Sequence, residues 1–220
     1  MNAQTLLLVG SGGLAREVAA VARHSNQWQL LGFCDDDPLR QGAVIDGIPV
    51  LGSTDLVHER PNAAVLLCVG SPVRPTSRGV LADRLNLPPQ RYATLVHPSA
   101  YVAPGVELGV GTIMLAGAVV TAPQRVGSHV VAMPLTVLTH DDEVSDFVTF
   151  ATRVALGGGV RVDRAAYIGA GAVIRENVKI GARALVGLGS VVLNDVPSDE
   201  VWVGNPARRL RAARGGAARS

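Results

Sequence analysis

Apolar residues recur at every sixth position through the second half of the chain, without a break in phase. The residue four positions after each of them is usually small or β-branched. A period of six fits neither an α-helix, which repeats every 3.6 residues, nor an alternating strand. It predicts short strands that each turn one aliphatic side chain inward, in coils that stack and bury one another. The series runs Val96, Val102, Leu108, Met114, Val120, Val126, Ala132, Leu138, Val144, Phe150, Leu156, Val162, Ile168, Ile174, Ile180, Val186 and Val192.

The preceding part of the chain shows another pattern, in which short apolar runs alternate with amphipathic stretches. Such alternation predicts a small parallel sheet of the Rossmann-like α/β kind, whose ligands bind at the carboxyl ends of the strands. We expect strands over residues 5–9, 29–34 and 63–69, and helices over residues 14–24 and 76–85.

A glycine turn, Gly10-Ser11-Gly12-Gly13, joins the first strand to the first helix. Its backbone N–H groups could hold phosphates at the positive end of the helix, or its glycines could simply make a tight turn. An NAD site with Asp35 on the ribose is less favoured, because the rest of the chain is solenoid and offers no catalytic domain for a dehydrogenase. We therefore expect a nucleotide or nucleotide-sugar site.

The two patterns divide the 220 residues into an α/β domain over 1–92, a β-solenoid over 93–203, and a closing loop with a basic tail over 204–220. A hydrophobic content of 48% is ample for buried cores. The net charge is only +2, and no aromatic residues interleave with the basic ones as nucleic-acid binding would require. Arginines gather in the tail, where we expect a solvated terminus whose first members are available to cofactor phosphates: Arg208, Arg209, Arg211, Arg214 and Arg219.

The two cysteines, Cys34 and Cys68, fall in predicted strands and have no neighbours at metal-ligand spacing. Buried thiols indicate a reducing compartment. The opening residues are too short and uncharged for a signal peptide, and no apolar run approaches membrane length. We therefore expect a cytoplasmic protein.

The hexapeptides IGAGAV at 168–173, IGARAL at 180–185 and VGLGSV at 186–191 resemble those of the hexapeptide-repeat acyltransferases. This resemblance implies a left-handed parallel β-helix with three hexapeptides in each coil. Relatives with this fold transfer acyl groups, bind metal or act as scaffolds, so the fold alone does not decide the function.

Three N-terminal segments support a narrower resemblance: LVGSGGLAREVA, LLGFCDDDP and GIPVLGSTDL, in that order. Together they resemble the bacterial sugar acetyltransferases that modify UDP-4-amino-sugars, perosamine or sialic acid. The resemblance implies that the glycine turn and the following acidic pair hold the nucleotide-sugar, at Gly12, Gly13, Leu14, Asp35 and Asp36. Many members have a histidine where this chain has Leu14.

Acetyl transfer from a thioester needs a base for the proton of the attacking group and donors for the developing oxyanion. His140 follows the inward Leu138 by two residues, so we expect it at a corner of the coil, and Asp141 follows it directly. The pair resembles the general base and its acidic partner in the sugar acetyltransferases. A solvated polar corner is the alternative interpretation.

Acetyl-CoA is the implied co-substrate, with no metal. The resemblance implies that it lies along the solenoid in the cleft between the subunits of a homotrimer. Relatives often have a second histidine at the place of Thr149 and an Asn-Thr pair at Met133-Pro134. We expect Thr149, Gly158, Ala170 and Leu188 to contact the cofactor, with Ala170 and Leu188 stacked in one column.

These features favour N-acetylation of a nucleotide-linked amino-sugar in bacterial glycan biosynthesis. Acetylation of a hydroxyl on sialic acid or another sugar is an alternative, as is a non-catalytic nucleotide-sugar-binding scaffold. A γ-type carbonic anhydrase shares the solenoid but needs three histidines around one zinc ion. Only His129 and His140 lie in the coils, which disfavours that function.

Overall fold

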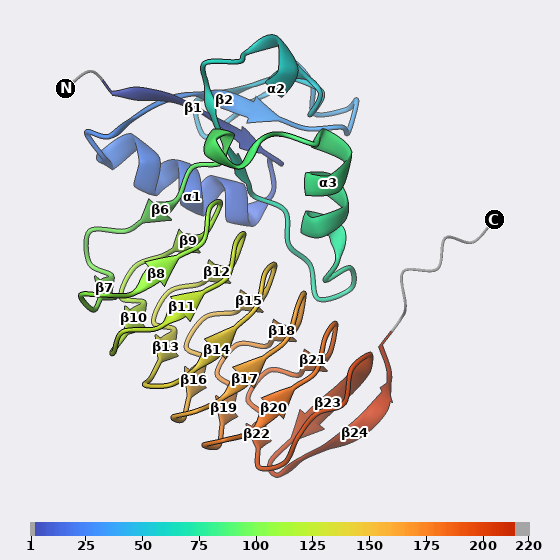
Figure 1. The fold of residues 1–220 in the computed structure, drawn as a ribbon. Helices are drawn as coiled ribbons and strands as arrows, with labels where there is room; N and C mark the ends of the chain where they lie inside the picture. The colour runs from blue at the N-terminus through green and yellow to red at the C-terminus, as the bar shows by residue number, and fades with distance from the viewer. Residues whose placement is uncertain (1–2, 214–220) are drawn as a thin grey trace.

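The computed structural model describes residues 3–213. Its N-terminal domain is a five-stranded sheet in the order β3-β4-β2-β1-β5, parallel except for β3. This arrangement confirms the predicted small Rossmann-like sheet (Figure 1). The strands are β1 (Gln4–Val9), β2 (Trp28–Cys34), β3 (Val44–Ile45), β4 (Ile48–Gly52) and β5 (Ala64–Leu67). The helices are α1 (Gly13–His24), α2 (Leu56–Glu59) and α3 (Ser77–Leu85), with a 3₁₀ turn over Pro89–Arg91.

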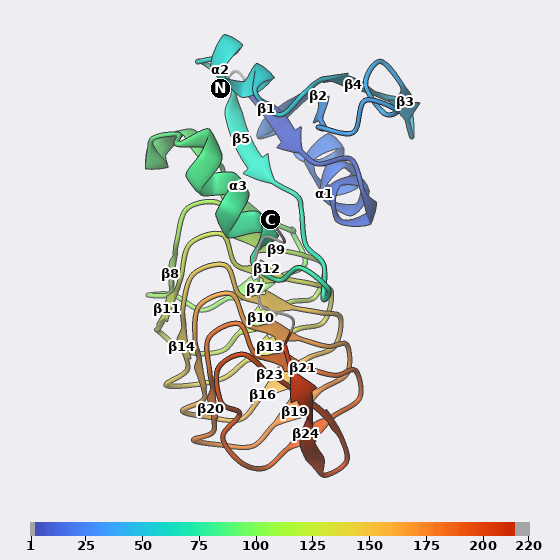
Figure 2. The same ribbon diagram turned by 90° about the vertical axis from the view of Figure 1, so that its right-hand side faces the viewer.

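The rest of the described chain is a β-solenoid built from two-residue strands on three sheets. Strands pair in parallel with those 18 residues further on, as Val119 does with Val137, so three hexapeptides make one coil. Figures 1 and 2 show the coils stacked below the N-terminal domain. This architecture agrees with the left-handed β-helix expected of hexapeptide repeats.

The eight-stranded sheet contains β6 (Leu95–Val96), β9 (Ile113–Met114), β12 (Val131–Ala132), β15 (Thr149–Phe150), β18 (Tyr167–Ile168), β21 (Leu185–Val186), β23 (Glu200–Gly204) and β24 (Ala207–Ala212). The six-stranded sheet contains β7 (Tyr101–Val102), β10 (Val119–Val120), β13 (Val137–Leu138), β16 (Ala155–Leu156), β19 (Val173–Ile174) and β22 (Val191–Val192). The five-stranded sheet contains β8 (Glu107–Leu108), β11 (Arg125–Val126), β14 (Glu143–Val144), β17 (Arg161–Val162) and β20 (Lys179–Ile180).

The six-residue series forms the solenoid core. Every member from Met114 to Val192 is buried. The first three members differ: Val96 is 41% exposed, and Val102 and Leu108 are half-buried. They belong to the first coil, which has no preceding coil to cover it.

The outward residues of the three sheets differ in character. The eight-stranded sheet is covered at its N-terminal end, where Leu95, Ile113 and Val131 pack in one cluster with α1 and the N-terminal sheet. The five-stranded sheet presents charged side chains, namely Glu107, Arg125, Glu143, Arg161 and Lys179. The six-stranded sheet presents an uncovered row that we name the apolar face: Tyr101, Val119, Val137, Ala155, Val173 and Val191.

A buried arginine joins α3 to the solenoid. Arg78 is 1% exposed, and its Nε–H donates to the carbonyl oxygen of His129 at 2.8 Å. Its Nη2 donates to the Phe147 carbonyl at 2.9 Å and to Thr149 Oγ1 at 2.8 Å, while Nη1 donates to Val69 within its own domain. These acceptors are neutral, so burial lowers the pKa of Arg78 to about 10.

The chain forms further regular structure beyond residue 203, where the sequence predicted a closing loop and tail. Strands β23 and β24 pair as an antiparallel hairpin at the edge of the eight-stranded sheet. Ala207 is buried against the solenoid core, which anchors this hairpin. Arg208, Arg209 and Arg211 lie on β24, whereas Arg214 and Arg219 are outside the described residues. In residues 3–213, no helix has both the length and the apolar character that a membrane crossing needs.

Candidate active site

His140 lies in the turn between β13 and β14, where the chain passes from the apolar face to the charged face. Thr139, His140, Asp141 and Asp142 make this corner, and Asp141 adopts the left-handed backbone conformation with φ of 61°. The side chain of His140 is 68% exposed. The six-residue spacing therefore positions the histidine outside the coil, at one edge of the apolar face.

His140 and Asp141 form a hydrogen-bonded pair. The Nδ1 atom of His140 lies 2.8 Å from Oδ2 of Asp141. Because a carboxylate only accepts, Nδ1 carries the proton and Nε2 presents its lone pair to solvent. The hydrogen bond and the negative charge of Asp141 raise the pKa of His140 above its ordinary value. This arrangement provides a general base that is close to its working range at neutral pH.

Gly158 lies one coil after His140 and gives its imidazole room. A Cβ atom built on Gly158 would be 2.4 Å from Cε1 and 2.6 Å from Nε2 of His140. Real side chains do not tolerate such distances, so any larger residue at position 158 would have to displace the ring. The glycine is therefore required by the position of the base.

The glycine run 157–159 also leaves a backbone donor beside the imidazole. The N–H groups of Gly157 and Gly159 donate to the carbonyls of Ile174 and His140, at 2.8 and 3.0 Å. Within residues 3–213, the N–H of Gly158 has no such partner. A free N–H next to a general base is suited to hold the oxyanion of an acyl-transfer reaction.

The glycine turn of the N-terminal domain has separate structural and open parts. Gly10 has φ of +99° and lies against Cys68 and Val69, so the turn itself requires this glycine. Gly12 and Gly13 do not have positive φ, and no atom lies within 4 Å of a Cβ built on either. Gly12 is the N-cap of α1, without a side-chain capping bond. The turn therefore leaves space and uncapped N–H groups at the positive end of the helix.

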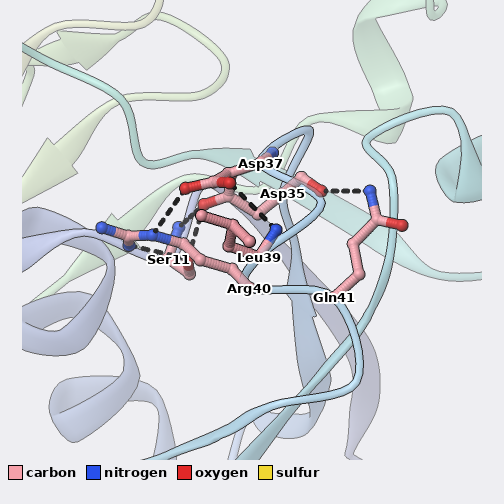
Figure 3. A network of polar contacts seen from close by, with 6 residues as sticks. All are labelled: Ser11, Asp35, Asp37, Leu39, Arg40 and Gln41. Atoms are coloured by element: carbon pink, nitrogen blue, oxygen red, sulfur yellow. Dashed lines mark hydrogen bonds and ion pairs between the residues drawn. The ribbon is translucent and has the colours of Figure 1, made fainter.

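The acidic residues after β2 point in different directions. Asp35 Oδ2 accepts hydrogen bonds from the backbone N–H and the hydroxyl of Ser11 in the glycine turn. Arg40 reaches the same hydroxyl through Nη1 at 3.0 Å (Figure 3). Asp36 instead accepts from the backbone N–H and hydroxyl of Thr54 and pairs with Arg84 of α3 at 2.7 Å. Only Asp35 is therefore joined to the glycine turn.

Leu14 and Thr149 stand where the sequence resemblance implies histidines in relatives, and neither side chain lies in an open site. Leu14 is half-buried and packs against the core cluster of the N-terminal domain. Thr149 is 9% exposed, and its hydroxyl already accepts the bond from Arg78. The structure does not bring Thr149 to the His140 corner.

Ala170 and Leu188 are stacked at a different corner, between the eight-stranded sheet and the apolar face. Gly171 N–H donates to Thr152 O and Gly189 N–H donates to Ala170 O, which fixes the predicted column. Both side chains are exposed, Leu188 by 82%. Within one chain, this column and His140 lie at opposite edges of the apolar face.

Two residues near the predicted sites were missed by the sequence reasoning. Arg40 follows the acidic run by a few residues, and no sequence signal separates it from other exposed arginines. Asp142 did leave a signal, because it occupies the position four residues after Leu138, where other coils have small or β-branched residues. It is 3% exposed. In the described part of the chain, no three His, Cys, Asp or Glu side chains gather as a metal site would require.

Comparisons with known proteins agree with this geometry. Residues 5–73 match the family model described as the PglD N-terminal domain. GDP-perosamine N-acetyltransferase of Escherichia coli O157:H7 is 34% identical over 214 residues, covering 93% of this chain and 95% of that protein.

Two solved structures have the same fold over almost the whole chain. The first is PerB from Caulobacter crescentus in complex with CoA and GDP-perosamine, with 27% identity, a TM-score of 0.83, and coverage of 94% of this chain and 97% of the other. The second is the acetyltransferase domain of PglB from Neisseria gonorrhoeae FA1090 in complex with acetyl coenzyme A. It has 26% identity, a TM-score of 0.81, and coverage of 94% and 100%.

Proposed function

Because this chain belongs to the hexapeptide-repeat acetyltransferase family that includes GDP-perosamine N-acetyltransferase, we propose that it acetylates the amino group of a nucleotide-linked sugar. Acetyl-CoA is the donor. The observation that carries this proposal is the His140–Asp141 pair, whose free Nε2 lies beside the glycine run 157–159. An exposed histidine in a merely solvated corner would not need a glycine beneath its ring.

The residues divide the chemistry between them. The amine nitrogen attacks the thioester carbonyl carbon, and Nε2 of His140 takes the proton that the nitrogen loses. Asp141 holds the ring and stabilises the imidazolium, while the N–H of Gly158 donates to the oxyanion. The C–S bond then breaks, and the CoA thiolate takes from His140 the proton that came from the amine. The products are the acetamido-sugar and free CoA.

The nucleotide-sugar is assigned to the glycine turn. Gly12 and Gly13 leave room for a phosphate at the uncapped N-terminus of α1, and Asp35 lies beside them through its bonds to Ser11. Asp36 is committed to Thr54 and Arg84, so its contribution to binding is indirect. A GDP-linked 4-amino-sugar is the first candidate, because two of the relatives that are similar over almost the whole chain are a GDP-perosamine N-acetyltransferase and a structure in complex with GDP-perosamine.

The three different faces of the solenoid support a homotrimer. One face is covered by the N-terminal domain at its N-terminal end, one is charged, and the apolar face is the uncovered apolar surface that suits another subunit. A cyclic assembly brings opposite edges of this face together. It would join the His140 corner of one subunit to the Ala170–Leu188 column of the next, so we assign acetyl-CoA to that cleft. The two free buried cysteines and the use of acetyl-CoA support a cytoplasmic enzyme.

A thiol-release assay tests the function. The protein is mixed with acetyl-CoA and, in turn, with GDP-, UDP- and dTDP-linked 4-amino-sugars and free sialic acid. Turnover on one nucleotide amino-sugar is expected, and His140→Ala should lower it by roughly a hundredfold or more. His58→Ala, which alters an exposed histidine in α2, serves as the control.

Other outcomes identify the alternatives. Turnover confined to sialic acid would indicate a sugar O-acetyltransferase. If acetyl-CoA and a nucleotide-sugar bind but no thiol is released, the protein is a non-catalytic scaffold and the proposal fails.

A further inference from the structure

Asp142 is a buried acid at an inward position of the solenoid, where the other hexapeptides have aliphatic, small or neutral polar side chains. It stands in one column with Gln124 one coil before it and Val160 one coil after it. Equivalent inward positions in other coils hold residues such as Ala118, Val130 and Ala172, all of which are fully buried. Burying a carboxylate there costs stability unless its oxygens are bonded.

Both oxygens of Asp142 are bonded to backbone N–H groups of the catalytic corners. Oδ2 accepts from Thr139 at 2.8 Å, within the His140 turn. Oδ1 accepts from Val160 at 2.9 Å, at the end of the glycine run that holds Gly158. The Asp142 carboxylate therefore connects the turn that carries the proposed base, His140, to the turn that carries the proposed oxyanion donor, Gly158.

These bonds replace the ordinary backbone bonds of a solenoid corner. At several other inward positions the N–H donates to the carbonyl three residues earlier, as from Ala118 to Leu115 and from Ala172 to Gly169, each at 3.1 Å. At the His140 corner, the N–H of Asp142 instead donates to the Gln124 side chain at 3.0 Å. The geometry of this corner thus depends on the buried Asp142 carboxylate and the half-buried Gln124 amide rather than on the backbone alone.

Asp142 also contributes charge. Its surroundings contain His140 and Asp141 in the same turn, and Arg125, Glu143 and Asp146 around a depression of about 350 Å³ on the charged face. Burial raises the pKa of Asp142 to about 6, so the carboxylate is ionised at neutral pH and protonated below that range. The ionised form adds to the effect of Asp141 in raising the pKa of His140.

We propose that Asp142 is a positioning residue for the transfer reaction, and that it holds the general base His140 and the oxyanion donor Gly158 in register while strengthening the base. This inference rests on the proposed function for its kinetic consequences. The effect of Asp142 on the pKa of the His140 imidazole does not rest on the proposed function, because it is present whichever acceptor the protein uses.

The test compares Asp142→Asn with wild-type protein by NMR titration of the His140 ring and by the pH profile of kcat/KM. Asn keeps the size and one acceptor oxygen but removes the charge. We expect the His140 pKa and the acidic limb of the profile to move to lower pH together. The plateau of kcat should fall about tenfold, with KM for acetyl-CoA unchanged.

Asp146→Asn is the matched control, because Asp146 also accepts a backbone N–H from the preceding coil, that of Ser128 at 2.8 Å. It should leave the His140 titration in place. In wild-type protein, the His140 resonance should also show a second inflection at about pH 6 as Asp142 titrates. This measurement does not depend on the folding of any variant.

A fall in melting temperature without movement of the His140 titration or the acidic limb would overturn the inference and leave Asp142 a structural residue. An equal shift in Asp146→Asn would overturn it as well. If no acceptor is turned over but the NMR shifts appear as described, the inference about Asp142 stands and the proposed function fails.

Discussion

The imidazole of His140 occupies the space that a Cβ atom of residue 158 would need, so it lies against Gly158, one coil further along the solenoid. The pair is separated by 18 residues, which is the length of one coil. The stacking register therefore couples the position of the base to the size of the residue below it.

Gly158→Ala should impair catalysis without unfolding the protein. Its methyl group would overlap the ring of His140, which is exposed and can move away. Displacement of the base by about 1 Å lowers kcat on the order of a hundredfold. Steady-state kinetics and a melting curve measure the two effects. Gly79→Ala is the control, since its new methyl group makes only ordinary contacts at 3.8 Å with Phe147.

His129 should make the junction between the domains sensitive to acid. Its ring packs between Tyr92 and Phe147, and burial, with the charge of Arg78, lowers the pKa of His129 to about 4. The folded protein thus disfavours the protonated ring. Stability is complete above about pH 6.5 and falls as the pH drops towards 4, by on the order of 3 kcal/mol.

Denaturant melts of wild type and His129→Asn between pH 4 and 7.5 measure this effect. Asparagine tolerates the left-handed backbone of position 129, where φ is 55°. Asp142 changes stability in the opposite direction over part of this range, so the difference between the two proteins isolates His129. Parallel curves would show that folding does not shift the pKa of His129, and the prediction would fail.

Arg78→Lys should destabilise the protein although the charge is kept. Lysine lacks the planar fork that serves carbonyls on two corners of the solenoid and a hydroxyl at once. Leaving several of these acceptors unpaired costs about 3 kcal/mol. Chemical denaturation measures the loss against Arg74→Lys, which changes an exposed arginine in the preceding loop. Equal stability of the two variants would mean that Arg78 does not fasten the domains.

Val173→Lys should convert the proposed homotrimer into monomers. The side chain is 47% exposed in the single chain and stands in the apolar face, so a charge there is tolerated by the fold but not by a subunit interface. Light scattering coupled to size-exclusion chromatography measures the mass of the assembly. The activity should fall as the assembly dissociates. Glu107→Lys on the charged face is the control. A variant that stays trimeric would exclude this face as the interface.

The repeat made most of the fold predictable, because one inward side chain per hexapeptide leaves few other ways to bury the chain. The exceptions have physical causes. Val96 fits the repeat but is exposed, since the pattern cannot tell where the stack of coils ends. Arg78 lies in α3, and its five acceptors come from segments that no spacing in the sequence brings together.

The candidate site was predictable only where it follows the repeat. The spacing located His140 at a corner, and a glycine at position 158 could be expected near it. The contacts of Thr149 depend on α3, which packs on the solenoid from a distant part of the sequence. Asp142 could have been identified as an acid among aliphatic positions, but its two bonded corners become visible only in three dimensions.

The stacked coils also fix the distances between sites along the solenoid axis. Each coil advances the solenoid by one strand spacing, about 4.8 Å. An insertion or deletion of 18 residues keeps every later strand on its own sheet, because three hexapeptides make one coil, whereas one of six or twelve residues would move the later strands to a different face. The height of the base below the N-terminal domain can therefore change in evolution only in whole coils. The distance between the base and the N-terminal domain therefore cannot change gradually. Adaptation to a longer or shorter sugar must come from changes in the loops.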